Sequence, residues 1–71
     1  MINAVVKNLI LNATKTCGAD VNGVMGFILE NLTEKEYSDV KAFLTWSFTN
    51  KKYFGWGNFD ERYAEFKVSY K

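Results

Sequence analysis

The stretch LTEKEYSDVKAFLTWSFTN, residues 32–50, carries the clearest local signal in the chain. Thr33 and Glu36 have the spacing of a capping box. In this motif the threonine hydroxyl accepts a hydrogen bond from the glutamate amide, and the glutamate carboxylate accepts one from the threonine amide. The motif predicts a helix that begins at Glu34 and ends near Asn50. Its expected apolar arc comprises Tyr37, Val40, Phe43, Leu44 and Phe48.

Two more helices are predicted before this one. Over residues 2–16 apolar side chains recur at helical spacing, and Gly18 follows where a helix C-terminal glycine belongs. A second amphipathic segment has Asp20 as its predicted N-cap and carries Gly23 and Gly26 together on its polar side. These glycines indicate either a close approach by another backbone or a weak helix. The apolar positions are Ile2, Val5, Val6, Leu9, Ile10, Ala13 and Cys17 in the first helix, and Val21, Val24, Met25, Ile28 and Leu32 in the second.

The last segment fits a β-hairpin. Residues 53–56 would form a short strand, Gly57 and Asn58 the turn, and residues 62–70 the return strand. Apolar and polar side chains alternate at the end of this stretch, which is the period of a strand. We therefore expect an α+β fold, in which three helices are followed by a C-terminal β-hairpin.

The same residues also fit a fourth helix. Asn58 would cap it, and Asp60 and Glu61 would lie in its first turn. Its apolar stripe would comprise Phe59, Tyr63, Phe66 and Tyr70. The alternative fold is thus an all-α four-helix domain.

Size and composition exclude several classes of protein. The chain has 71 residues and a net charge of +1, so residues 1–71 are expected to form a single domain. No stretch approaches the roughly 20 apolar residues that a membrane span needs. The N-terminal apolar run lacks the basic lead-in of a signal peptide. Cys17 is the only cysteine, which excludes an internal disulfide and fits a reducing compartment.

Catalysis is not expected. Histidine is absent, which removes the usual general base and the commonest metal ligand. One cysteine cannot form a zinc site, and no glycine-rich phosphate loop is present. We expect no enzyme activity, no cofactor and no metal.

Aromatic residues concentrate toward the C-terminus. Trp46 is predicted to point away from the apolar arc of its helix, either as a binding hot spot or packed beneath the C-terminal segment. Trp56, between Gly55 and Gly57, is predicted to lie at a loop tip or flat on the domain's own sheet. The predicted partner-binding residues are Trp46, Trp56, Tyr53, Phe59, Lys35 and Asp39.

Three stretches together resemble the winged helix-turn-helix family: DVKAFL at residues 39–44, KKYF at 51–54 and RYAEFKV at 62–68. They are similar to the end of a recognition helix, the beginning of a wing and its return strand. Ser47 departs from the family, which usually has an apolar residue there. The resemblance implies DNA binding, in which the third helix enters the major groove. The start of that helix, residues 34–39, carries three acids against one lysine, so the implied phosphate contacts are Lys51, Lys52, Arg62 and Lys67.

Two functions follow as hypotheses. The first is a small non-catalytic protein that docks on a protein partner and regulates or inhibits it. In size and composition the chain is similar to the accessory proteins with which bacteriophages disable host machinery. The alternative is a winged-helix DNA-binding regulator, and a structural or self-assembly subunit is the third class considered. We expect a protein partner, with DNA as the alternative, no membrane, a homodimer joined through the C-terminal aromatics, and a cytoplasmic location, which is the host cytoplasm if the protein is viral.

Overall fold

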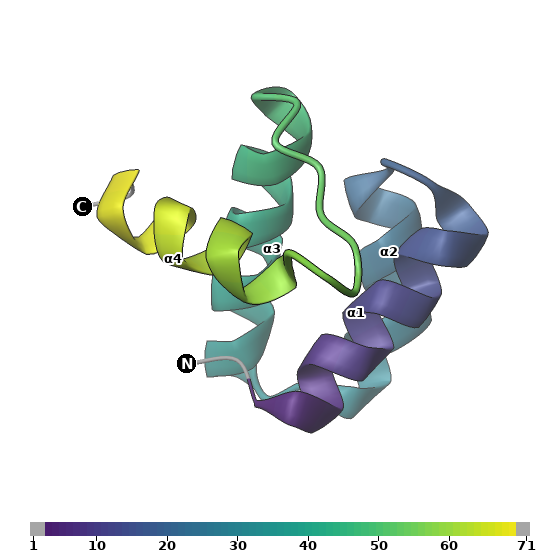
Figure 1. Ribbon diagram of the computed structural model, residues 1–71. Coiled ribbons are helices and arrows are strands. Elements are labelled where there is room, and N and C mark those ends of the chain that lie inside the picture. The colour runs from purple at the N-terminus through teal and green to yellow at the C-terminus, as the bar shows by residue number, and fades with distance from the viewer. Residues whose placement is uncertain (1–2, 70–71) are drawn as a thin grey trace.

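The structure, a computed structural model, describes residues 3–69 and is all-helical over that range (Figure 1). The elements are α1 (Ala4–Cys17), α2 (Val21–Ile28), the short 3₁₀ segment η1 (Leu29–Asn31), α3 (Glu34–Thr49) and α4 (Phe59–Ser69). α3 stands in the middle of the molecule, with α1 and α2 on one side and α4 crossing it on the other (Figure 1). The expected single domain is consistent with one continuous core that draws residues from all four α-helices.

Local hydrogen bonds define several helix ends, whereas Asp20, the predicted N-cap of α2, makes no side-chain cap bond. The capping box of α3 is confirmed: the Glu36 amide donates to Thr33 Oγ1 at 3.2 Å, and the Thr33 amide donates to Glu36 Oε1 at 3.0 Å. Asn3 caps α1, because its Oδ1 accepts from the Val6 amide at 2.9 Å. Gly18 ends α1 with a φ of 73°, the left-handed region that glycine adopts most readily.

The predicted C-terminal β-hairpin is wrong. No strand is present within residues 3–69, and residues 62–69 of the expected return strand lie in α4. The reason is the direction in which the aromatic side chains of this segment point. In a strand, Tyr63 and Phe66 would face opposite sides, whereas a helix places both against Phe43 on α3. Val68, which supported the alternation, is 71% exposed.

The alternative all-α fold is therefore confirmed. The Arg62 amide donates to the Asn58 carbonyl at 2.9 Å, so α4 begins where the helical interpretation placed it. Asp60 and Glu61 lie in its first turn. Tyr70, the last residue of the predicted stripe, lies outside the described residues.

Most of the predicted apolar faces form the core, with one rotation in α1. Val5 is 69% exposed, while Leu11, which the predicted stripe omitted, is buried. The stripes of α2 and α3 are confirmed at their central positions. The buried apolar residues are Val6, Ile10, Leu11, Ala13, Val24, Met25, Ile28, Val40, Phe43, Leu44, Phe59 and Phe66.

The two glycines of α2 differ in their surroundings. A Cβ placed on Gly23 would lie 3.0 Å from Asp20 Oδ2 and 3.3 Å from the Cys17 Cβ, so neighbouring side chains leave little room at this position. No atom lies within 4 Å of a Cβ placed on Gly26. Side chains therefore crowd Gly23 alone, and the atoms nearest to it do not belong to another backbone.

The ring of Phe43 lies at the centre of an aromatic cluster. This fully buried residue has ring contacts, with centroids 5.3–6.3 Å apart, to Trp46, Phe54, Phe59, Tyr63 and Phe66. The C-terminal aromatics that we expected to join two copies thus pack largely inside one chain. The homodimer itself remains a prediction.

A residue just beyond the C-terminal end of α3 has a left-handed backbone conformation although it is not glycine. Lys51 has a φ of 57°. Its amide donates to the Phe48 carbonyl at 3.4 Å, and the Lys52 amide donates to the Ser47 carbonyl at 2.8 Å. This pair of bonds is the Schellman motif, in which glycine usually occupies the left-handed position.

Lys51→Gly is expected to raise the free energy of unfolding by about 1 kcal/mol, because glycine adopts a positive φ without the steric cost of a side chain. The greater freedom of glycine in the unfolded chain offsets part of this gain. Lys52→Gly is the matched control, since Lys52 does not have a positive φ, and it should give no gain. Urea unfolding of both variants measures the difference. A Lys51→Gly protein no more stable than Lys52→Gly would contradict the assigned backbone conformation.

Candidate functional site

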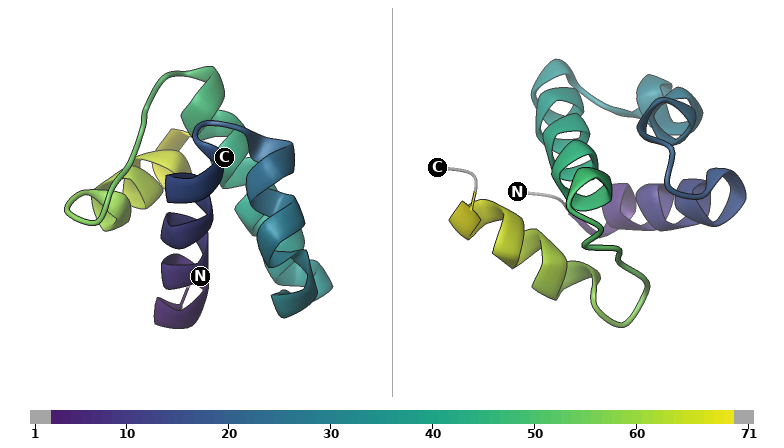
Figure 2. Two further views of the ribbon diagram at one scale, coloured as in Figure 1. Left: turned by 90° about the vertical axis from the view of Figure 1, so that its right-hand side faces the viewer. Right: turned by 90° about the horizontal axis from the view of Figure 1, so that it is seen from above.

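The segment between α3 and α4, residues 50–58, is the longest stretch without helix within the described chain, and we call it the α3–α4 loop. Both views in Figure 2 place the bend of this green segment at the outer edge of the molecule. The loop has no acidic residue and contains Lys51, Lys52, Tyr53 and Trp56. It therefore brings together four of the residues that the sequence singled out.

The loop is anchored at its start by Ser47. This side chain is fully buried, and its Oγ donates to the Lys52 carbonyl at 2.7 Å. The Ser47 carbonyl in turn accepts from the Lys52 amide, so two hydrogen bonds join the same pair of residues. An apolar side chain at this position, as in the winged-helix pattern, could not make the first of these bonds.

A second anchor joins the loop to α4. Asn58 Oδ1 accepts from the Gly55 amide at 2.6 Å, and Asn58 Nδ2 donates to the Tyr53 carbonyl at 3.4 Å. Arg62 Nε donates to the same Tyr53 carbonyl at 3.0 Å. Between these bonds the Phe54 ring packs on Phe43, with centroids 5.3 Å apart. The loop backbone is thus held at both ends and in the middle.

Two large aromatic side chains point outward from this fixed backbone. Trp56 is 59% exposed and Tyr53 is 50% exposed. The Tyr53 ring contacts Phe48 at a centroid distance of 6.3 Å. Within residues 3–69, no aromatic ring stacks on Trp56. Exposed aromatics on a preformed backbone are a common arrangement in protein-binding surfaces.

Two other predicted partner-binding aromatics are less available. The expectation that Trp46 points away from the core is wrong, because its ring lies 6.3 Å from Phe43 and 5.8 Å from Phe66 beneath α4. The other interpretation, packing beneath the C-terminal segment, is correct. Trp46 remains half-buried and borders a groove of about 610 Å³ on the outer face of α3. Phe59 is 2% exposed and cannot form a contact surface in this fold.

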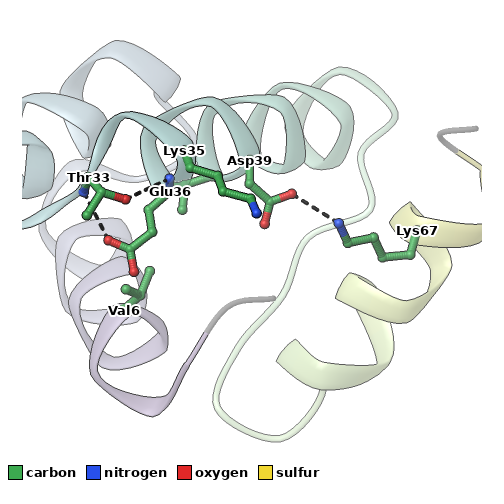
Figure 3. A pocket seen from close by; sticks show the side chains of 7 residues that line it. Val6, Thr33, Lys35, Glu36, Asp39 and Lys67 are labelled. Carbon is green, nitrogen blue, oxygen red and sulfur yellow. Dashed lines mark hydrogen bonds and ion pairs between the residues drawn. The ribbon is translucent and has the colours of Figure 1, made fainter.

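Lys35 and Asp39 lie elsewhere, at a cavity of about 300 Å³ between α1, α3 and α4 (Figure 3). Asp39 Oδ2 accepts from the Tyr63 hydroxyl at 2.6 Å, and Asp39 Oδ1 pairs with Lys67 Nζ at 3.2 Å. The Glu36 carboxylate is turned back toward the Thr33 amide (Figure 3). The described carboxylates of this cavity are thus occupied in bonds within the chain.

The Asp39–Tyr63–Lys67 network ties α3 to α4 and changes two pKa values. Burial, followed by the hydrogen bond to Asp39, raises the pKa of the Tyr63 phenol above 10.0. Hydrogen bonds to Tyr63 and then Asp39 raise the pKa of the Lys67 ammonium above 10.5. Asp39, on α3, contributes to both shifts, and we assign the network a structural role.

The four predicted phosphate-binding residues do not form one surface. Lys51 and Lys52 are exposed on the loop and belong to none of the ion pairs within residues 3–69. Arg62 bonds to the Tyr53 carbonyl and, at 2.8 Å, to Glu65. Lys67 is paired with Asp39 across the α3–α4 interface. With the wing replaced by a helix, the geometry that implied DNA contacts is absent from the described chain.

No group of three or more His, Cys, Asp and Glu side chains in residues 3–69 is arranged to hold a metal ion. None of the helices over the same range combines the length and apolarity that crossing a bilayer requires.

Comparison with known proteins gives no relative: no protein-family model matches the chain, and it shows no significant similarity to a curated protein or to a solved structure.

Alkaline pH should destabilise the fold through Tyr63 and Lys67. A group whose pKa is raised on folding stabilises the protein below its ordinary pKa, and this contribution is lost as the pH rises through the raised value. Tyr63→Phe should cost about 1 kcal/mol at neutral pH through the lost hydrogen bond. It should also make the decline in stability above pH 10.0 shallower than in the wild type. Denaturant unfolding at several pH values measures both effects.

The matched control is Tyr53→Phe, which removes a phenol from an exposed site and should leave the Tyr63–Asp39 bond intact. Equal alkaline slopes for wild type and Tyr63→Phe would contradict the raised pKa of Tyr63 in the folded protein.

Proposed function

We propose that this protein is a small non-catalytic binding protein that docks on a protein partner through the α3–α4 loop and regulates or inhibits it. The observation that supports the proposal is the exposure of Trp56 and Tyr53 on a loop whose backbone is held by Ser47, Asn58 and Arg62.

The energetic argument concerns what binding would cost and gain. Ordering a flexible loop on binding opposes association, and a loop that is already ordered avoids most of this cost. Tryptophan and tyrosine lose few rotatable bonds when they are buried, and they are enriched among hot-spot residues. A single hot-spot side chain contributes about 2 kcal/mol or more, which corresponds to roughly thirtyfold in affinity.

Regulation would then follow from the presence of the bound protein on its partner. A chain of 8.2 kDa that performs no chemistry acts by covering a surface of its partner or by changing which state of the partner is populated. This is the mode of action expected of the bacteriophage accessory proteins that the chain resembles in size and composition. A partner in the cytoplasm, or in the host cytoplasm for a viral protein, is part of the same proposal.

Trp56→Ala should weaken partner binding at least about tenfold and leave the free energy of unfolding nearly unchanged, because the side chain is mostly exposed. Phe27→Ala is the matched control, since it removes an aromatic that is also largely exposed but lies on α2. All three proteins are used as immobilised baits in a lysate of the cells in which the protein acts, with and without nuclease treatment.

The expected result is one protein retained by wild type and Phe27→Ala and lost with Trp56→Ala. Equal retention by all three baits would exclude the loop as the docking site. Retained material that disappears after nuclease treatment would favour the DNA-binding alternative.

A further inference from the structure

We infer that the partner presents an acidic segment to this surface, in which carboxylates flank an apolar side chain that contacts Trp56 and Tyr53. The inference rests on the proposed function and names the chemistry of the partner at the same site.

The charge distribution along the chain is the first observation. No Asp or Glu occurs from Val40 through Phe59, whereas Lys41, Lys51 and Lys52 lie within that range. These twenty residues therefore carry a charge of +3, and the whole chain carries +1, so the remaining residues carry −2. The loop and the second half of α3 are positive in a chain that is negative elsewhere.

The second observation is that these cations have no acidic partner of their own. The ion pairs within residues 3–69 engage Lys7, Arg62 and Lys67. Lys51 and Lys52 are exposed and lie directly before Tyr53. Their backbone amides already satisfy carbonyls at the end of α3, so their side chains are not needed to close the helix. They are free to meet charges on another molecule.

The acid-free surface also extends beyond the loop. None of the residues that line the groove on the outer face of α3 carries a carboxylate, and Lys41, Trp46 and Asn50 are among them. The groove ends at Asn50, the first residue of the loop. A bound segment that leaves the loop along α3 would therefore meet lysine but no opposing negative charge, and charge complementarity of this kind favours the correct partner and speeds its association.

An acidic protein segment suits this surface better than a nucleic acid. A nucleic-acid strand presents regularly spaced phosphates, and affinity rises with the number of cations that meet them. Arg62 and Lys67 could have added further phosphate contacts, but both side chains are bonded within the chain. Lys51 and Lys52 beside two exposed aromatics match a short segment with a few carboxylates and one apolar anchor.

The test is selection from a yeast-displayed library of random 12-residue peptides with the wild-type protein as bait. We expect enrichment of peptides that combine at least two Asp or Glu with a large apolar residue. The affinity of a selected peptide is then measured for wild type and for Lys52→Glu, which should bind it at least about fivefold more weakly at low salt. The difference should shrink as salt is raised.

The matched control is Lys15→Glu, an identical charge change at an exposed α1 lysine that belongs to no ion pair of the described chain. It should bind the peptide within about twofold of wild type. A twelve-nucleotide oligo-dT is measured in parallel and should bind more weakly than the selected peptide.

The inference fails if the selected peptides are neutral or basic, if no sequence is enriched, if Lys52→Glu and Lys15→Glu bind alike, or if oligo-dT binds more tightly than every peptide. Failure of the proposed function is distinguishable. If Trp56→Ala no longer binds a peptide whose affinity is unchanged by Lys52→Glu, the loop is a docking site but its partner is not acidic. If Trp56→Ala binds the peptide as well as wild type, the loop is not the docking site.

Discussion

The Phe43 ring and the aromatic rings packed around it connect α3, the α3–α4 loop and α4. Phe43 lies on α3, and its contacts include Phe54 from the loop as well as Phe59 and Phe66 from α4. α4 has a weakly amphipathic sequence, and a helix of its length is marginal by itself. It is therefore helical in the folded protein because its apolar side packs on Phe43, and the loop is placed by the two helices that it joins.

The sequence predicted the parts of the fold that depend on near neighbours. Thr33 and Glu36 define the start of α3 by bonds across three residues, and Gly18 ends α1 in the same local way. The structure of residues 59–69 could not be settled locally, since its residues fit both period two and a helix. Tyr63 and Phe66 contact Phe43, which lies about twenty residues earlier in the chain, and these contacts favour the helix. Trp46 was misplaced for the same reason, because its angle on α3 does not reveal that α4 covers it.

The candidate site shows a similar division. Glycines beside Trp56 indicated a loop tip from sequence alone, and its exposure agrees with that prediction. What the sequence could not show is that the loop is anchored. Ser47 looked like a departure from a family pattern, yet in the fold its buried hydroxyl joins the end of α3 to Lys52. A polar residue in an apolar position was the available signal, since buried hydroxyls require a partner.

The central claim is that the α3–α4 loop is ordered before any partner binds. Backbone ¹⁵N relaxation of the free protein tests it most directly, by giving order parameters for residues 51–58. We expect values near those of α3, about 0.85, and a clear decrease around Lys52 in Ser47→Ala, where the side-chain bond is lost. Values below about 0.6 across the loop of the wild-type protein would contradict the account, because Trp56 and Tyr53 would then be carried by a mobile segment.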